Sequence, residues 1–168
     1  MTPVFKKLNL KDQTTIVIES APDSFEGEIA ALRGVNVQRK LEGLVSFSLV
    51  FVTRQKDIDA AATKLGRHAA SDAVVWFAYP KQSSKSYRCE FNRDTGFRPL
   101  GAIGFEPVRM VAIDADWSAV RFRRVEHIKR LTRGEEHALS AAGRDKIRAS
   151  AASPGSGKSP KSKRLARK

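Results

Sequence analysis

One apolar stretch, residues 73–79 (Ala-Val-Val-Trp-Phe-Ala-Tyr), constrains the fold more than any other part of the chain. It ends at Pro80 and is followed at once by the polar residues Lys-Gln-Ser-Ser-Lys at 81–85. An apolar run of this length that is bounded by a breaker predicts a strand buried on both faces. The polar residues then lie at the carboxyl end of the strand, where open α/β sheets tend to bind ligands.

Apolar periodicity on either side of that run predicts alternating strands and helices. We expect strands at 14–19, 35–38 and 44–53, a helix that follows the 20–24 turn and ends before Gly34, and a second helix at 56–70. A helical turn is expected near 97–103. Two later strands, 108–114 and 118–124, are joined so closely that they form an antiparallel hairpin. This order predicts a Rossmann-like layered α/β domain with a mostly parallel sheet and a C-terminal hairpin.

The composition divides the chain into three parts. Residues 1–130 carry the α/β domain. Thr132 and Glu135 have the spacing of a capping box, which predicts a surface helix within 131–152. Residues 153–168 combine Pro, Gly and Ser with basic side chains and hold no acidic residue, so we expect this tail to be disordered.

Charge is concentrated in the second half of the chain. The net charge is +13; residues 1–80 hold 10 Lys/Arg and 9 Asp/Glu, whereas residues 81–168 hold 21 and 9. Such asymmetry indicates a polyanionic partner. The tail could contact nucleic-acid phosphates without reading sequence, or it could be solvated with no dedicated partner. Its basic residues are Lys158, Lys161, Lys163, Arg164, Arg167 and Lys168.

Several functional classes lack their usual sequence signals. Cys89 is the only cysteine, so an internal disulfide and a zinc site built from Cys pairs are excluded, and no metal site is expected. No apolar run approaches the roughly 18–20 residues that span a bilayer, and no signal-peptide pattern is present, so we expect a soluble, cytoplasmic protein without membrane contact. No covalent-nucleophile motif occurs. The acidic, glycine-free turn at 20–24 argues against the usual dinucleotide cofactors, and none is assigned.

The polar residues after Pro80 form the first candidate site. Tyr79, Lys81, Ser83, Ser84 and Lys85 could hold a phosphate or carboxylate. The alternative is a soluble loop after a buried strand, since the spacing matches no phosphate-binding loop.

Acidic and arginine residues supply two further candidates. Asp114 and Asp116 are more typical of turn formers than of an acid–base or metal pair. Arg121 and Arg123 share one strand face and could form an anion patch with Arg109 or Arg98; alternatively they pair with nearby acids.

Three segments resemble a group of small bacterial α/β proteins of unknown function. They are 5–13, 74–87 and 91–128, which contain the patterns AYPK, RDxGxxPLGxxGFExVR and AIDxDWSAxRFR. The likeness covers roughly residues 4–130. A more distant likeness, to a second bacterial α/β group, rests on the strand ending in Pro-Lys and the Trp-Ser-Ala strand. The resemblance implies the fold and a bacterial origin, and it implies no catalytic residue.

Two main functional hypotheses follow. The first is a non-catalytic binding or interaction module whose basic C-terminal appendage contacts anionic partners, with nucleic acid as one candidate. The alternative is an enzyme or small-ligand-binding protein that uses an anion pocket at the carboxyl end of the central strand. A third hypothesis is that the shared domain binds a protein partner. The sequence leans against an enzyme and leaves the small-molecule ligand open.

Overall fold

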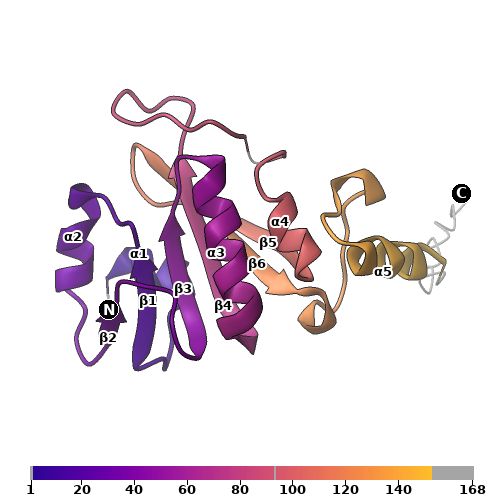
Figure 1. The fold of residues 1–168 in the computed structure, drawn as a ribbon, viewed down its shortest axis with the longest axis horizontal. Helices are drawn as coiled ribbons and strands as arrows, with labels where there is room; N and C mark the ends of the chain where they lie inside the picture. The colour runs from indigo at the N-terminus through magenta and orange to yellow at the C-terminus, as the bar shows by residue number, and fades with distance from the viewer. Residues whose placement is uncertain (1, 93, 153–168) are drawn as a thin grey trace, which may run out of the picture.

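The computed structural model describes residues 2–92 and 94–152, which form a six-stranded sheet flanked by helices (Figure 1). The strand order is β2-β1-β3-β4-β6-β5. The strands are β1 (Thr15–Glu19), β2 (Asn36–Gln38), β3 (Val45–Phe51), β4 (Ala69–Pro80), β5 (Phe105–Ala112) and β6 (Trp117–Arg124). The first four strands are parallel, and the β5–β6 hairpin adds two antiparallel strands beside β4. The predicted Rossmann-like sheet with a terminal hairpin is therefore confirmed.

Helices cover the two faces of the sheet with separate apolar clusters. On one face, α1 (Pro3–Lys7) and α2 (Asp23–Ala30) pack over side chains such as Ile18, Leu49 and Trp76. On the other face, α3 (Gln55–His68) and α4 (Arg98–Ala102) pack over Val75 and Phe77. Alternate residues of each strand enter opposite clusters, because successive side chains in a strand point to opposite faces.

Strand β4 lies in the middle of the sheet, as its apolar run predicts. It pairs with β3 on one side and β6 on the other. The predicted helix at 56–70 and the apolar run at 73–79 leave residues 71–72 as the connection between helix and strand. This is wrong, because α3 ends at His68 and β4 already begins at Ala69. Two tertiary contacts extend it: Ala69 pairs with Val45 of β3, and Asp72 forms an ion pair with Arg123 of β6 at 2.6 Å.

The C-terminal helix begins later than the capping-box pattern indicates. The chain after β6 contains short 3-10 turns at Val125–His127 (η1) and Glu135–His137 (η2), and α5 spans Ala141–Ala152. Ser140 caps α5, since its Oγ accepts a hydrogen bond from Gly143 N at 2.9 Å. The predicted start after Thr132 is therefore wrong.

Among the residues that the structure describes, no helix has the length and hydropathy of a membrane-spanning segment.

Candidate functional site

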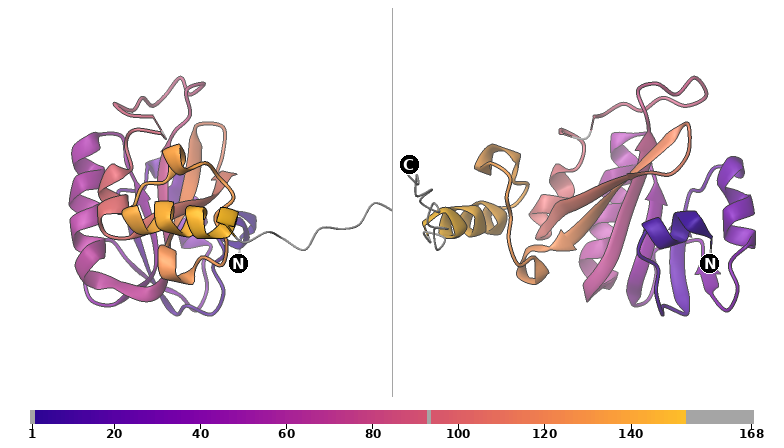
Figure 2. Two further views of the ribbon diagram at one scale, coloured as in Figure 1. Left: turned by 90° about the vertical axis from the view of Figure 1, so that its right-hand side faces the viewer. Right: turned by 180° about the vertical axis from the view of Figure 1, so that it is seen from behind.

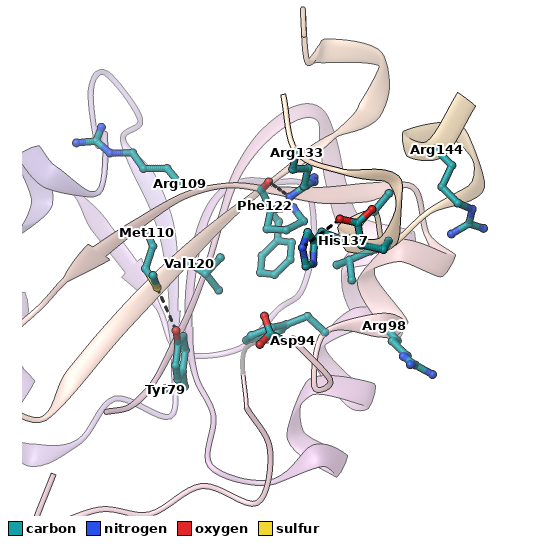
Figure 3. Close-up of a pocket in the computed structure, with 15 residues that line it drawn as sticks. Tyr79, Asp94, Arg98, Arg109, Met110, Val120, Phe122, Arg133, His137 and Arg144 are labelled. Carbon is teal, nitrogen blue, oxygen red and sulfur yellow. Dashed lines mark hydrogen bonds and ion pairs between the residues drawn. The ribbon is translucent and has the colours of Figure 1, made fainter. Parts of the chain in front are cut away.

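A cavity of about 820 Å³ lies at the β5–β6 end of the sheet, between α4 and the C-terminal segment. It is bounded by the carboxyl end of β4, by β5 and β6, and by η2 and the start of α5 (Figure 3). The lining residues are Tyr79, Asp94, Phe97, Arg98, Pro107, Arg109, Met110, Val120, Phe122, Arg133, Glu136, His137, Ala138, Leu139 and Arg144. A volume of this size is typical of sites for small organic ligands.

The floor of the cavity is apolar and built from aromatic side chains. Phe97 packs against Phe122 with ring centroids 5.0 Å apart and against Tyr79 at 6.0 Å. Val120 and Phe122 come from alternate positions of β6, so both project to the same side of the sheet. Figure 3 shows Phe122, Val120 and Tyr79 facing the hollow. Such a floor accepts the apolar part of a ligand.

Two arginines stand at the mouth of the cavity. Arg98 and Arg144 are exposed, and neither has an ion pair with another described residue. Arg109 also borders the cavity, but it pairs with Arg121 on the other face of the β5–β6 hairpin, and Figure 3 shows its guanidinium directed away from the hollow. Because arginine side chains are long and present fixed N–H forks, they can turn toward a carboxylate or phosphate that enters the mouth.

Acidic and imidazole side chains share the lining. Glu136 lies 3.5 Å from His137, and both are exposed. Asp94 is also exposed at the lip. Neither carboxylate forms an ion pair with Arg98 or Arg144, so both guanidiniums stay available to a ligand.

One wall of the cavity is the C-terminal segment 133–144, which Glu106 of β5 anchors. The Glu106 carboxylate is fully buried and accepts hydrogen bonds from Arg133 Nη2 at 2.6 Å, Leu139 N at 3.1 Å, and Ser140 N and Oγ at 2.7 Å each. Arg133 also donates to Pro107 O at 2.7 Å. Burial lowers the pKa of the Arg133 guanidinium below its ordinary value. These contacts fix the wall to the sheet.

Close approach of two glycines completes this anchorage. A Cβ at Gly143 would collide with the Glu106 carboxylate, and one at Gly101 would collide with the backbone of Leu139. Both positions therefore require the absence of a side chain, which lets the segment lie directly on β5 and α4.

The structure separates the residues that the sequence grouped after Pro80. Tyr79 lines the cavity, and its hydroxyl donates to Met110 Sδ at 3.2 Å. Lys81 instead donates through Nζ to the carbonyl of Asp114, and Ser84 is buried with its Oγ bonded to Asp116 Oδ1 at 2.7 Å. Ser83 and Lys85 are exposed and do not line the cavity. Lys81 and Ser84 therefore tie the loop to the β5–β6 turn.

The turn interpretation of the aspartates is confirmed. Asp114 Oδ1 accepts hydrogen bonds from Asp116 N at 2.8 Å and Trp117 N at 2.7 Å, which closes the turn between β5 and β6. The described residues include no group of three or more His, Cys, Asp or Glu side chains arranged to hold a metal ion. The six basic tail residues named above lie outside the described residues.

Sequence reasoning missed most of the cavity lining. Phe97, Phe122 and Arg144 are far apart in the chain, and only the fold brings them together. One signal was available: Val120 and Phe122 alternate with arginines in a strand, which marks one apolar and one charged face. No local sequence pattern indicated that α5 and η2 would cover the apolar face.

Around the turn after β1, the charged side chains bind other parts of the protein and do not form an open ligand site. The Glu19 carboxylate accepts a hydrogen bond from Leu41 N at 2.9 Å and binds Lys64 Nζ at 3.0 Å. Ser20 has a φ of 60°, and Pro22 precedes the helix. Beyond β2, Arg39 binds Glu26 through two contacts at 2.6 and 2.8 Å. These side chains are already engaged with one another.

Comparison with solved structures identifies the fold. No family model and no curated protein matches the chain. A SAM-dependent methyltransferase from Aquifex aeolicus superposes with a TM-score of 0.50 and 15% identity, over 71% of this chain and 86% of that one. The chain has a methyltransferase-type fold.

Two further solved structures match less closely. A putative type 11 methyltransferase from Sulfolobus solfataricus has a TM-score of 0.43 and 8% identity, over 66% of this chain and 84% of that one. The N-methyltransferase NodS from Bradyrhizobium japonicum WM9 has a TM-score of 0.41 and 14% identity over 67% and 66%.

Proposed function

We propose that this protein binds a small organic anion in the cavity between β5–β6, α4 and the C-terminal segment. The observation that supports this most strongly is the combination of an aromatic floor with two arginines at the mouth, Arg98 and Arg144, that have no acidic partner among the described residues. The ligand has an apolar or aromatic body and a carboxylate or phosphate head. We favour this site over the basic tail as the main binding element, and we assign no reaction to it.

The chemistry of the two parts of the cavity determines the class of ligand. Aromatic rings meet Phe97 and Phe122 edge-on or offset, which adds to the gain from burying apolar area. A carboxylate or phosphate can form paired hydrogen bonds with a guanidinium fork, whereas a lysine-lined site would supply only point charges. Arg98 of α4 and Arg144 of α5 approach from different elements. A head group at the mouth can therefore contact both.

A set of naphthalene compounds tests this proposal. We expect 2-naphthoate and 1-naphthyl phosphate to raise the thermal unfolding midpoint and to bind saturably by isothermal titration calorimetry. The neutral 2-naphthalenemethanol should bind at least about tenfold more weakly, because it lacks the charged head. Replacing both Arg98 and Arg144 with alanine should reduce the affinity of the anions by about tenfold and leave that of the alcohol unchanged.

Replacing both Lys85 and Arg88 with alanine is the matched control. Both residues are exposed in the loop after β4 and do not line the cavity, so this variant also removes two positive charges, but elsewhere. Equal losses of affinity in this control and in the variant at Arg98 and Arg144 would show only a general charge effect and would contradict the proposal. So would equal binding of the alcohol and the carboxylate.

The cofactor in the name of the Aquifex aeolicus relative does not suit the residues of this chain. In doubly wound sheets, nucleotide-like ligands bind where the strand order reverses, against a glycine-rich turn, with an acidic residue about 20 positions later. Here the order reverses between β1 and β3, and the turn at 20–24 has no glycine. The Glu19 carboxylate already binds Leu41 N and Lys64 Nζ. The position where an acidic residue would be expected to contact the ribose is Arg39. We derive no methyl transfer from this fold.

The same comparison yields a prediction about cofactor binding. We expect S-adenosylhomocysteine at roughly 1 mM to leave the unfolding midpoint unchanged, since a ligand that does not bind the native state cannot stabilise it. Equilibrium dialysis with labelled S-adenosylmethionine provides an independent measurement. Saturable binding that Glu19→Ala alters would show that this turn is a cofactor site after all.

A further inference from the structure

Strand β5 ends the sheet with an open edge. It pairs with β6 on one side, and no described strand pairs with the other. The beginning of the strand is protected, because a register shift follows Pro107 and Arg133 binds the Pro107 carbonyl. The rest of the strand lacks such protection. Val108 and Met110 are 39% and 48% exposed, which is unusual for large apolar side chains among the described residues.

Arginines occupy one face of this open hairpin. Arg109 of β5 lies opposite Arg121 of β6, and Arg123 follows on the same side. Asp72 binds Arg123 at 2.6 Å, whereas Arg109 and Arg121 have no ion pair within the described part of the chain. The Nε of Arg121 is buried and makes no hydrogen bond to a described residue. Burial, together with Arg123 and Arg109, lowers the pKa of Arg121.

No described helix covers this arginine face. Seen from behind, α1 lies in front of the other end of the sheet, and β5 and β6 are open to the viewer (Figure 2, right). The opposite face of the same hairpin is apolar and forms the floor of the cavity, with Met110 paired to Val120. The open edge therefore separates a positive face from an apolar hollow.

We propose that an extended acidic segment of a partner protein adds to the edge of β5, with carboxylates and apolar side chains in alternation. In such strand addition, backbone hydrogen bonds provide affinity, and pockets for alternate side chains provide specificity. The carboxylates then lie over Arg109 and Arg121, and the apolar side chains lie over Met110 and enter the cavity. The apolar half of this inference rests on the proposed function of the cavity.

Charge decides between an acidic partner and a second copy of this chain. Pairing two β5 edges would bring two Arg109–Arg121 pairs together, and like charges opposite one another destabilise strand pairs. An acidic strand instead supplies the carboxylates that these guanidiniums lack. A protein with a net charge of +13 also attracts acidic segments over longer distances.

Fluorescence anisotropy with labelled peptides tests the proposal. The probe is a fluorescein-labelled peptide in which glutamate and leucine alternate over seven residues; its control has the same composition with the glutamates and leucines in separate blocks. We expect the alternating peptide to bind at least about tenfold more tightly. N-methylation of alternate backbone amides should abolish this advantage. Arg109→Glu should weaken binding by tenfold or more, whereas Arg88→Glu should change it little.

Each outcome bears on a separate part of the inference. Equal binding of the alternating and block peptides, or binding that N-methylation leaves intact, would show a general attraction for acidic peptides and overturn strand addition. The absence of any peptide binding would overturn it too. If the naphthalene anions still bind in that case, the cavity proposal stands and only the strand proposal fails. A dimer that Arg109→Glu alters would assign the edge to a second copy.

Discussion

Replacing Glu106 with alanine is expected to lower the free energy of unfolding by about 3–5 kcal/mol, the usual cost of removing one partner from a buried ion pair. The Glu106 carboxylate accepts hydrogen bonds from Arg133, Leu139 and Ser140, and it is fully buried. Its removal leaves the Arg133 guanidinium half-buried without a counter-charge and two backbone N–H groups without an acceptor. Urea denaturation followed by circular dichroism measures the loss.

The same variant should open the C-terminal wall before the rest of the fold unfolds. Trypsin cuts after basic residues, and Arg133 and Arg144 lie in this wall. We expect cleavage in segment 133–144 to become much faster in Glu106→Ala, and naphthoate binding to be lost with it. Glu126→Ala is the control, because the Glu126 side chain is 67% exposed. Unchanged stability and an unchanged cleavage pattern in Glu106→Ala would contradict the anchoring role.

The order of strands and helices was predictable because the apolar periodicity that sets it is local. Ile58 and Leu65 mark one face of α3, and the run that ends at Pro80 marks β4; both elements lie where the sequence placed them. Errors occurred where tertiary contacts override the local pattern. In the sequence, Asp72 resembles a residue of a connecting loop. In the structure it belongs to β4 and forms an ion pair with Arg123 of β6. The capping-box pattern at Thr132 does not start a helix, and Ser140 does so next to Glu106.

The candidate site was harder to predict, because its residues meet only in the folded chain. Lys81 and Ser84 have the chemistry of an anion site, yet both bond to the turn at Asp114–Asp116, more than 30 positions away. A single sequence does not reveal such a partner. Tyr79 was identified because it lies at the carboxyl end of the central strand, and the cavity does begin there. The two arginines at the mouth, Arg98 and Arg144, come from α4 and α5, so their convergence depends on the topology.

Replacing Trp76 with phenylalanine is expected to lower the free energy of unfolding by about 2–4 kcal/mol, which combines a packing defect with a lost hydrogen bond. Trp76 lies at the centre of β4 and is fully buried. Its indole Nε1 donates to the carbonyl of Leu8 at 2.7 Å, which fixes the end of α1 to the sheet. Phenylalanine leaves that carbonyl without its hydrogen-bond donor. Its smaller ring also leaves a cavity beside α1. Urea denaturation followed by circular dichroism reports the change.

Trp117→Phe provides a matched control for the hydrogen bond. Trp117 is also buried, at 3% exposure, but its Nε1 has no hydrogen-bond partner among the residues that the structure describes. Both substitutions remove the same indole, so the difference between them isolates the bond to Leu8, worth about 1 kcal/mol or more. Each single variant also retains one tryptophan as a fluorescent reporter. If Trp117→Phe proved as destabilising as Trp76→Phe, the bond to Leu8 would contribute nothing, and α1 would be held to the sheet by apolar packing alone.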